Sequence, residues 1–347
     1  MSSEKLTVLS INHAHIMAQN ASDKKDYARM REIWLKVRDN LDIIGDCNDY
    51  HNYSVVMSGA DDYLTAYEIV VRGMTQFPYN TDLLADAIYY GSNCNKYVEC
   101  QKYVEILSNR PFSSWTWRAF QFLIDYFLDA RNWQKDENTI IDGLNTALTI
   151  AGRYQVYCPS DERSYLAEYD IRQELAKVSM DQEDYEESEK QMQDALTVLK
   201  NAIQNGKYAA VQCSLRYADE MFRQQQYQEV IKTCDKALQY GQSTATARLG
   251  YFMYLSAQSR EVLLYKSKRD WWTNKAEINC IYSEYLAALS DTGSDYIRNI
   301  KRRVNILAAR SGIEPPQALM NSFNGPEDIS ALIKKLDSLK NMDLEKI

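Results

Sequence analysis

The sequence has little glycine and proline, with 12 glycines and 6 prolines among 347 residues. No proline occurs between Pro159 and Pro315, so a long stretch lacks the residue that most strongly interrupts helices. A protein made of sheets would need many more turn residues at this length. The shortage argues against a sheet protein and favours a chain built almost entirely of helices.

Motifs for catalysis and metal binding are also missing. The sequence has no glycine-rich phosphate loop, no nucleophile elbow and no HExxH pattern. Its 7 cysteines form no CxxC pair, which predicts free thiols in a reducing compartment. His13 and His15 are two positions apart, a spacing that points side chains to opposite sides of a helix rather than at one metal ion. We therefore expect no enzymatic activity, no cofactor and no metal site.

The charge balance is acidic, with a formal net charge of -8. Such a chain as a whole repels nucleic acid and anionic membrane surfaces. The first residues lack the layout of a signal peptide, and no apolar run is long enough to span a bilayer. These observations predict a cytoplasmic protein whose partner is a protein or peptide rather than nucleic acid or a membrane.

An aromatic residue recurs along the chain, each time after a short polar run that is typical of a turn. The first four copies are separated by 36, 34 and 36 residues, and two later copies follow after 52 and 42. A fixed period of this size is the sequence signature of a helical repeat protein. The recurring aromatics are Tyr27, Tyr63, Tyr97, Trp133, Tyr185 and Tyr227.

Two further positions keep step with these aromatics. Ten residues after four of them stands a small residue, Gly73, Gly143, Ala195 or Ala237, whereas Val37 and Leu107 depart from this rule. Seven residues after each aromatic stands a residue that we expect in the core: Trp34, Val70, Val104, Ile140, Met192 and Cys234. We expect Cys234, like Cys100, to fill the interior of its hairpin. Over residues 5 to 240 the pattern resembles the tetratricopeptide (TPR) repeat, whose period is 34 residues.

This resemblance implies an all-α fold, a right-handed solenoid of antiparallel helical hairpins. We expect TPR-like hairpins over 1–151, longer TPR-like hairpins over 161–291, and capping helices with a tail over 292–347. Within the last part, the breaks predict helices at about 295–311, 315–322 and 327–340. The segment 152–160 would interrupt the array and is the candidate hinge.

In TPR-like proteins the first helices of successive hairpins line a concave groove that binds a protein or peptide. The resemblance therefore implies a non-enzymatic scaffold or adaptor. Aligning the hairpins on the recurring aromatics gives these candidate partner-binding residues: His51, Tyr89, Asn93, Gln121, Asp125, Gln173, Lys177, Asp219, Phe222 and Arg223.

Two charged segments leave other functions open. Residues 161–194 contain 12 acidic and 4 basic side chains, and residues 298–310 contain five basic side chains and no acidic one. Solvated helix faces explain both segments, but the first could also receive a basic partner, and the second could touch nucleic acid or dock within the chain. The basic turn around Trp271 and Trp272 could also contact a partner. The alternatives to a scaffold are a peptide- or ligand-sensing regulatory subunit and a nucleic-acid-associated accessory subunit.

Overall fold

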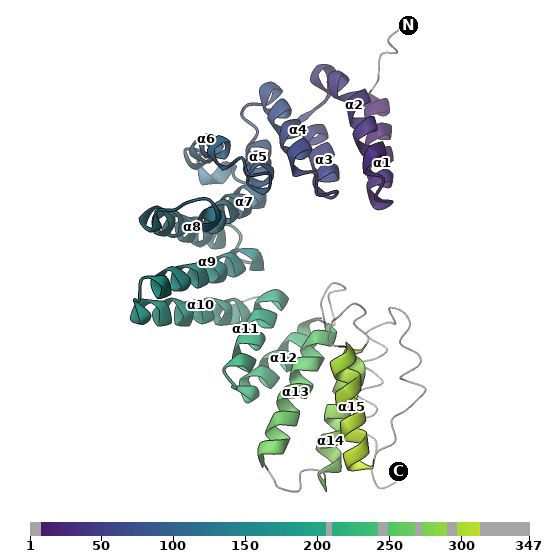
Figure 1. Ribbon diagram of the computed structural model, residues 1–347, viewed down its shortest axis with the longest axis vertical. Helices are drawn as coiled ribbons and strands as arrows, with labels where there is room; N and C mark the ends of the chain where they lie inside the picture. The colour runs from purple at the N-terminus through teal and green to yellow at the C-terminus, as the bar shows by residue number, and fades with distance from the viewer. Residues whose placement is uncertain (1–7, 206–209, 242–248, 268–272, 290–296, 313–347) are drawn as a thin grey trace. The chain divides into compact units, whose positions relative to one another are not determined.

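The computed structural model describes residues 8–205, 210–241, 249–267, 273–289 and 297–312. Over these ranges the chain is all-α, with 15 α-helices, short 3-10 segments and no strand (Figure 1). Trp271, Trp272 and the helices predicted at 315–322 and 327–340 lie outside the described residues.

The contacts within the chain divide it into two compact units, residues 1–195 and 196–347. The helices of the first unit are α1 (Val8–Asp23), α2 (Tyr27–Ile44), α3 (Cys47–Ser58), α4 (Tyr63–Gln76), α5 (Thr81–Asn93), α6 (Tyr97–Ser108), α7 (Trp117–Leu128), α8 (Glu137–Tyr157), α9 (Glu162–Asp181) and the first half of α10 (Tyr185–Asn205). The 3-10 turns are η1 (Phe112–Ser114) and η2 (Asp129–Asn132). The second unit contains the rest of α10, then α11 (Val211–Arg223), α12 (Tyr227–Gly241), α13 (Leu249–Ser267), α14 (Lys275–Ala288) and α15 (Ile297–Ser311).

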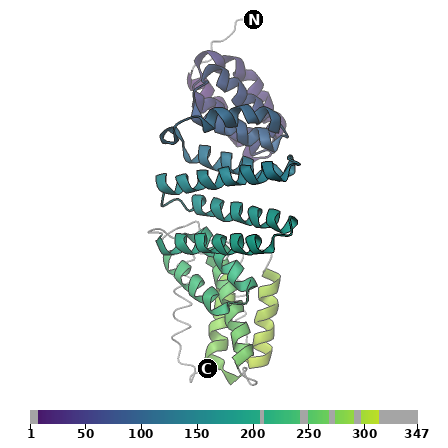
Figure 2. The same ribbon diagram turned by 90° about the vertical axis from the view of Figure 1, so that its left-hand side faces the viewer.

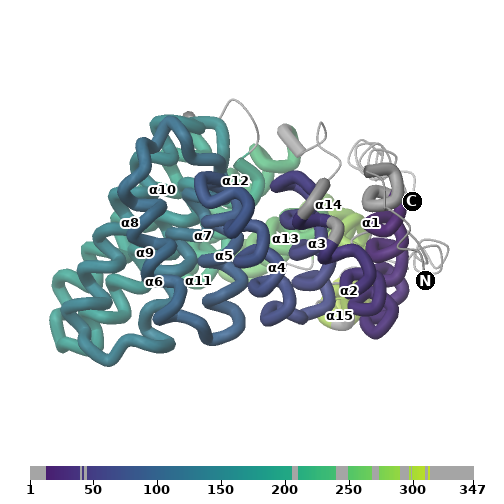
Figure 3. The backbone as a smooth tube through the Cα atoms, turned by 90° about the horizontal axis from the view of Figure 1, so that it is seen from above, coloured from purple at the N-terminus to yellow at the C-terminus, as the bar shows by residue number. Residues whose placement is uncertain are grey.

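Helices adjacent in the sequence pack as hairpins, among them α1 with α2, α3 with α4, α5 with α6 and α7 with α8. In the first unit the first helices of these hairpins also contact one another in order, α1 with α3, α3 with α5, α5 with α7 and α7 with α9. Figures 1 and 2 show α7 to α9 as successive layers, and Figure 3 shows the same helices from above, where they overlap. The expected all-α, TPR-like arrangement of helical hairpins is confirmed.

The recurring aromatics mark the starts of the second helices. Tyr27, Tyr63, Tyr97, Tyr185 and Tyr227 are the first residues of α2, α4, α6, α10 and α12. Trp133 is the exception, because it lies between η2 and α8.

A left-handed residue precedes each of these five tyrosines by two positions, with φ between 58° and 62°. The next residue then donates its backbone N–H to the carbonyl five residues earlier, as Asp26 does to Ala21 at 2.8 Å. This is the Schellman ending of a helix. In three hairpins the same residue is an aspartate that caps the next helix, as Asp26 does by accepting from the N–H of Arg29 at 3.1 Å. One short turn therefore ends the first helix and begins the second.

The two glycines predicted at the small-residue position of the second helices, Gly73 and Gly143, allow aromatic side chains of the preceding helices to pack close to the backbone. A Cβ on Gly73 would lie 2.7 Å from Cγ of Tyr50, and a Cβ on Gly143 would lie 3.2 Å from Cδ1 of Phe127. Ala195 and Ala237 are buried, and so are Val37 and Leu107, which occupy the same position in their hairpins. Of the expected core residues, Trp34, Val70, Val104, Ile140 and Cys234 are buried and Met192 is half-buried.

The break predicted at 152–160 is shorter in the structure, because only residues 158–161 separate α8 from α9. Helix α8 continues to Tyr157, and Tyr154 is fully buried with its ring stacked 4.8 Å from that of Phe120. Its hydroxyl donates to Asp161 at 2.5 Å, which ties the end of α8 to the start of α9. Tyr154 is a core residue of α8, whereas Tyr157 at the end of this helix is 53% exposed. The two compact units divide after Ala195, and the expected segments 1–151, 161–291 and 292–347 stay predictions.

The helix predicted at 295–311 is present as α15, and one residue of its basic run docks within the second unit. Arg303 Nε donates to Oε2 of the fully buried Glu261 on α13 at 3.0 Å, and the hydroxyl of Tyr285 donates to the same oxygen at 2.7 Å. Lys301 and Arg302 are exposed. The basic run thus combines a solvated face with one buried ion pair.

We expect Gly73→Ala to lower the free energy of unfolding by about 1–3 kcal/mol, because the new methyl group overpacks the contact with Tyr50. Gly152→Ala is the matched control, since Gly152 is exposed within α8 and a Cβ there meets no atom within 4 Å. That change should stabilise α8 by about 0.5–1 kcal/mol. Urea unfolding of both variants checks the pair, and equal effects would show that close approach at Gly73 does not matter.

Candidate functional site

The predicted partner-binding residues of the first unit lie on first helices, as the repeat pattern implied. His51 is on α3, Tyr89 and Asn93 are on α5, and Gln121 and Asp125 are on α7. Gln173 and Lys177 are on α9. Because α3, α5, α7 and α9 contact one another in order, these residues belong to one layer of helices. Their role in binding stays a prediction.

A pocket of about 210 Å³ opens on this layer, between α5 and α7. Three predicted residues, Tyr89, Asn93 and Asp125, contribute to its lining. The residues that the sequence analysis missed are Ser92, Phe122, Tyr126, Leu128 and Asp129. Phe122 stands 33 residues after Tyr89, about one repeat further along, and this spacing could have revealed it.

Aromatic rings form one side of the pocket. The rings of Tyr89 and Phe122 are stacked with centroids 4.4 Å apart and planes 18° apart. The ring of Tyr63 contacts that of Tyr89 edge-on, with centroids 6.4 Å apart. The ring of Trp117 contacts that of Phe122 in the same way, with centroids 6.3 Å apart. The packed rings hold one another in place, so this side of the pocket is preorganised.

The polar side of the pocket is acidic. Burial raises the pKa of Asp125 to about 6. Gln121 acts in the opposite direction and lowers this pKa, because its Nε2 donates a hydrogen bond to the carboxylate at 2.8 Å. The neighbouring charges that act on Asp125 are those of Asp129 and Asp170, and both raise its pKa further. Asp129 is exposed as a residue, but its carboxyl group is partly shielded from water, and this burial raises its pKa as well. Negative charge is therefore concentrated here and weakly compensated.

The position of these carboxylates on their helix adds to the negative potential. Asp125 lies in the last turn of α7 and Asp129 follows its end, while Ser92 and Asn93 are the last residues of α5. Backbone carbonyls at a helix C-terminus carry partial negative charge, which favours cations and disfavours carboxylates. Two helix C-termini and two aspartates thus converge on one pocket.

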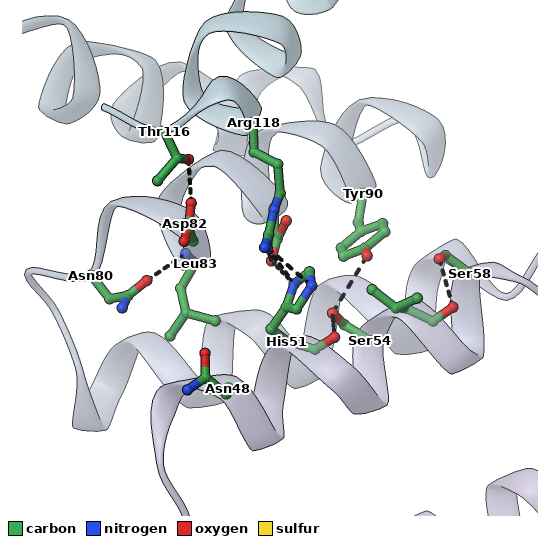
Figure 4. Close-up of polar contacts among 12 residues, drawn as sticks. Asn48, His51, Ser54, Ser58, Asn80, Asp82, Leu83, Tyr90, Thr116 and Arg118 are labelled. Atoms are coloured by element: carbon green, nitrogen blue, oxygen red, sulfur yellow. Dashed lines mark hydrogen bonds and ion pairs between the residues drawn. The ribbon is translucent and has the colours of Figure 1, made fainter. Parts of the chain in front are cut away.

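A second polar cluster joins α3, α5 and α7 (Figure 4). His51 Nδ1 lies 2.6 Å from Oδ2 of Asp86, and Nη1 of Arg118 lies 2.9 Å from the same ring nitrogen. Asp86 is almost fully buried, and burial raises its pKa although His51 and Arg118 act in the opposite direction. Nearby, Thr116 donates its hydroxyl to Asp82, which joins α5 to the residue before α7. These contacts hold the three first helices together.

The remaining predicted residues have partners within the chain. Gln173 donates to the hydroxyl of Tyr169 at 2.6 Å, and Lys177 pairs with Glu174. In the second unit, Asp219 accepts from Tyr251 at 2.7 Å and Arg223 pairs with Glu220 at 2.8 Å. Phe222 contacts Tyr227 edge-on at 5.5 Å. The structure brings none of these five residues to the pocket.

The cysteine predictions concern packing rather than chemistry. Cys100 and Cys234 are fully buried, as expected. Burial raises the pKa of the Cys100 thiol to about 12 and raises that of Cys234 as well, so both side chains are neutral thiols at neutral pH. Among the described residues, no group of His, Cys, Asp and Glu is arranged to hold a metal ion. Over the same residues, no helix has both the length and the apolar character needed to cross a bilayer.

The sequence matches no family model and no curated protein. Among solved structures, the chain is similar to the crystal structure of yeast Tom70, with 10% identity, a TM-score of 0.24 and coverage of 94% of this chain and 85% of that chain. It is also similar to a circular tandem repeat protein with novel repeat topology, with 11% identity, a TM-score of 0.19 and coverage of 96% and 83%. Likeness at this level defines no partner or activity. The class follows from the chain's own helices, which form an all-α, TPR-like helical repeat fold.

We expect Asp125→Asn to stabilise the protein at neutral pH by about 1–2 kcal/mol, because it removes a charge that folding desolvates. A carboxyl group whose pKa rises on folding binds its proton more tightly in the folded state. Below the unfolded-state pKa near 3.8 the Asp125 carboxyl group is protonated in both states, so its burial does not lower the free energy of unfolding. As the pH rises from there to about 6, the destabilisation caused by burying this group grows, and above about 6 it stays constant.

Urea unfolding at several pH values between 4 and 8 measures this difference. The advantage of Asp125→Asn over the natural chain should widen from pH 4 to 6 and then level off. Asp142→Asn, at an exposed position on α8, serves as the control for charge removal. An advantage that does not change with pH would contradict the burial of an ionisable Asp125.

Proposed function

We propose that this chain is a non-enzymatic scaffold or adaptor, and that the layer formed by α3, α5, α7 and α9 binds a segment of a partner protein. The observation that supports the proposal best is the pocket between α5 and α7. It lies on the first helices, where the resemblance to TPR repeats implies that a partner binds, and three predicted residues line it.

The size of the pocket favours one side chain of a macromolecule over a whole small molecule. Sites for drug-sized ligands usually enclose about 300–1,000 Å³, whereas this pocket measures about 210 Å³. The first-helix layer also carries amide and charged side chains away from the pocket, such as Gln121, Lys177 and Arg118, that suit a mixed peptide surface. A protein or peptide partner is thus favoured over the ligand-sensing alternative.

The nucleic-acid alternative receives less support from the second unit. It depends on the basic run at 298–310 within α15, and Arg303 in this run forms an ion pair with the buried Glu261. Neutralising phosphates requires several free cationic side chains. Of the basic residues in this run whose side chains the structure describes, Lys301 and Arg302 are exposed and Arg303 is paired.

We expect Asn93→Arg to reduce recovery of the partner at least about ten-fold, a loss of about 1.4 kcal/mol in binding. Asn93 is exposed at the pocket, so a long cationic side chain there would fill it without disturbing the core. The measurement is affinity purification of the tagged chain from its native cells, with quantitative mass spectrometry of the proteins that co-elute, performed with and without nuclease.

Val98→Arg is the matched control, because Val98 is 81% exposed on α6, the second helix of the same hairpin. It should retain the partner at the level of the natural chain. Equal recovery with Asn93→Arg and the natural chain would reject binding at this layer. Capture that disappears on nuclease treatment would favour the nucleic-acid-associated subunit instead.

A further inference from the structure

We propose that the pocket between α5 and α7 is an arginine-recognition site, which binds the guanidinium group of one arginine side chain in the partner peptide. This inference rests on the proposed function and specifies the chemistry of the partner. The pocket in question is the one lined by Tyr89, Asn93, Phe122, Asp125 and Asp129.

The charge around the pocket selects a cation. Asp125 and Asp129 line the pocket, and the charged groups that act on Asp125 from its own helix end and from α9 are Asp129 and Asp170, which are both acidic. Arg131 follows in η2, but its guanidinium pairs with Asp181 at 2.5 Å and Glu174 at 3.6 Å. A bound cation would relieve repulsion that the described chain itself leaves in place.

The two helix ends select a cation independently of the aspartates. The last turns of α5 and α7 both contribute to the lining, through Ser92 and Asn93 from one and Asp125 and Leu128 from the other. Placing carboxylates at the negative end of a helix opposes the usual preference. Such departures from local preference are concentrated where a protein binds something.

The aromatic side selects a flat cation. The rings of Tyr89 and Phe122 are stacked on each other, and both residues line the pocket. A guanidinium group is planar and weakly hydrated, so it loses little when it leaves water for an aromatic surface, where cation–π attraction stabilises it. An ammonium group is more strongly hydrated and offers no flat surface to stack.

The polar groups favour arginine over lysine for a second reason. The guanidinium carries five N–H donors in a rigid fork, which can engage the carboxylates of Asp125 and Asp129 and the amide oxygen of Asn93 together. A volume of about 210 Å³ accommodates one such side chain. The pocket therefore specifies one residue type, while the surrounding layer of first helices contacts the rest of the peptide.

The test is a selection of random twelve-residue peptides displayed on phage, with the full-length chain as bait. Asp125→Asn and Asp129→Asn are selected in parallel, and Asp142→Asn on α8 is the control. The natural chain and the control should enrich peptides that share an arginine at one position. In synthetic copies of an enriched peptide, citrulline at that position, which has nearly the same shape without the charge, should weaken binding at least about ten-fold, and lysine should bind less tightly than arginine.

The outcomes separate this inference from the proposed function. Peptides that are enriched without a shared arginine, or that bind equally well with citrulline, would overturn the arginine site and leave peptide binding intact. Enrichment of the same arginine by Asp125→Asn and Asp129→Asn would also overturn it, since both changes keep the shape of the pocket. If the natural chain enriches no peptide at all, both proposals are rejected.

Discussion

The turn between the two helices of a hairpin determines how the rest of the protein is arranged. In five hairpins a left-handed residue and a bond from the next N–H to the carbonyl five residues earlier direct the second helix back along the first. A residue other than glycine adopts the left-handed conformation at a cost of about 1–2 kcal/mol, and here Lys25, Asp61, Asn95, Glu183 and Gln225 do so. The turn therefore depends on the packing of both helices, and in return it brings those helices close enough to share a core.

Much of this arrangement can be predicted from the sequence, because the relevant signals are local. The aromatic that begins a second helix follows its turn directly, so a search for a fixed period finds Tyr27, Tyr63, Tyr97, Tyr185 and Tyr227. The interior positions seven and ten residues later are set by the helical period alone. The same reasoning fails at Trp133, because η2 lengthens the connection before α8. At 152–160 it predicts a longer break than the structure has, because α8 continues to Tyr157 and buries Tyr154.

The candidate site could be predicted only in part. Tyr89, Asn93 and Asp125 were found because they follow the repeat, whereas Asp129 lies in a 3-10 turn that no repeat position predicts. Contacts between residues that are far apart in the sequence could not be predicted either, because the repeat pattern gives positions on helices and not the pairing of side chains. The ion pair between Arg303 and Glu261 joins α15 to α13, and the cluster of His51, Asp86 and Arg118 joins three helices. Repeat patterns identify the layer of first helices, and non-local packing decides which of its side chains share a pocket.

Binding at the first-helix layer is the central claim, and hydrogen–deuterium exchange with and without a captured partner peptide tests it most directly. Helix amides exchange through local opening, which a bound ligand suppresses where it contacts the helix. We expect slower exchange in α5 and α7 when the peptide is bound, and unchanged exchange in α4, α6 and the exposed part of α8. Protection confined to second helices would contradict the claim and place the binding surface on the other layer.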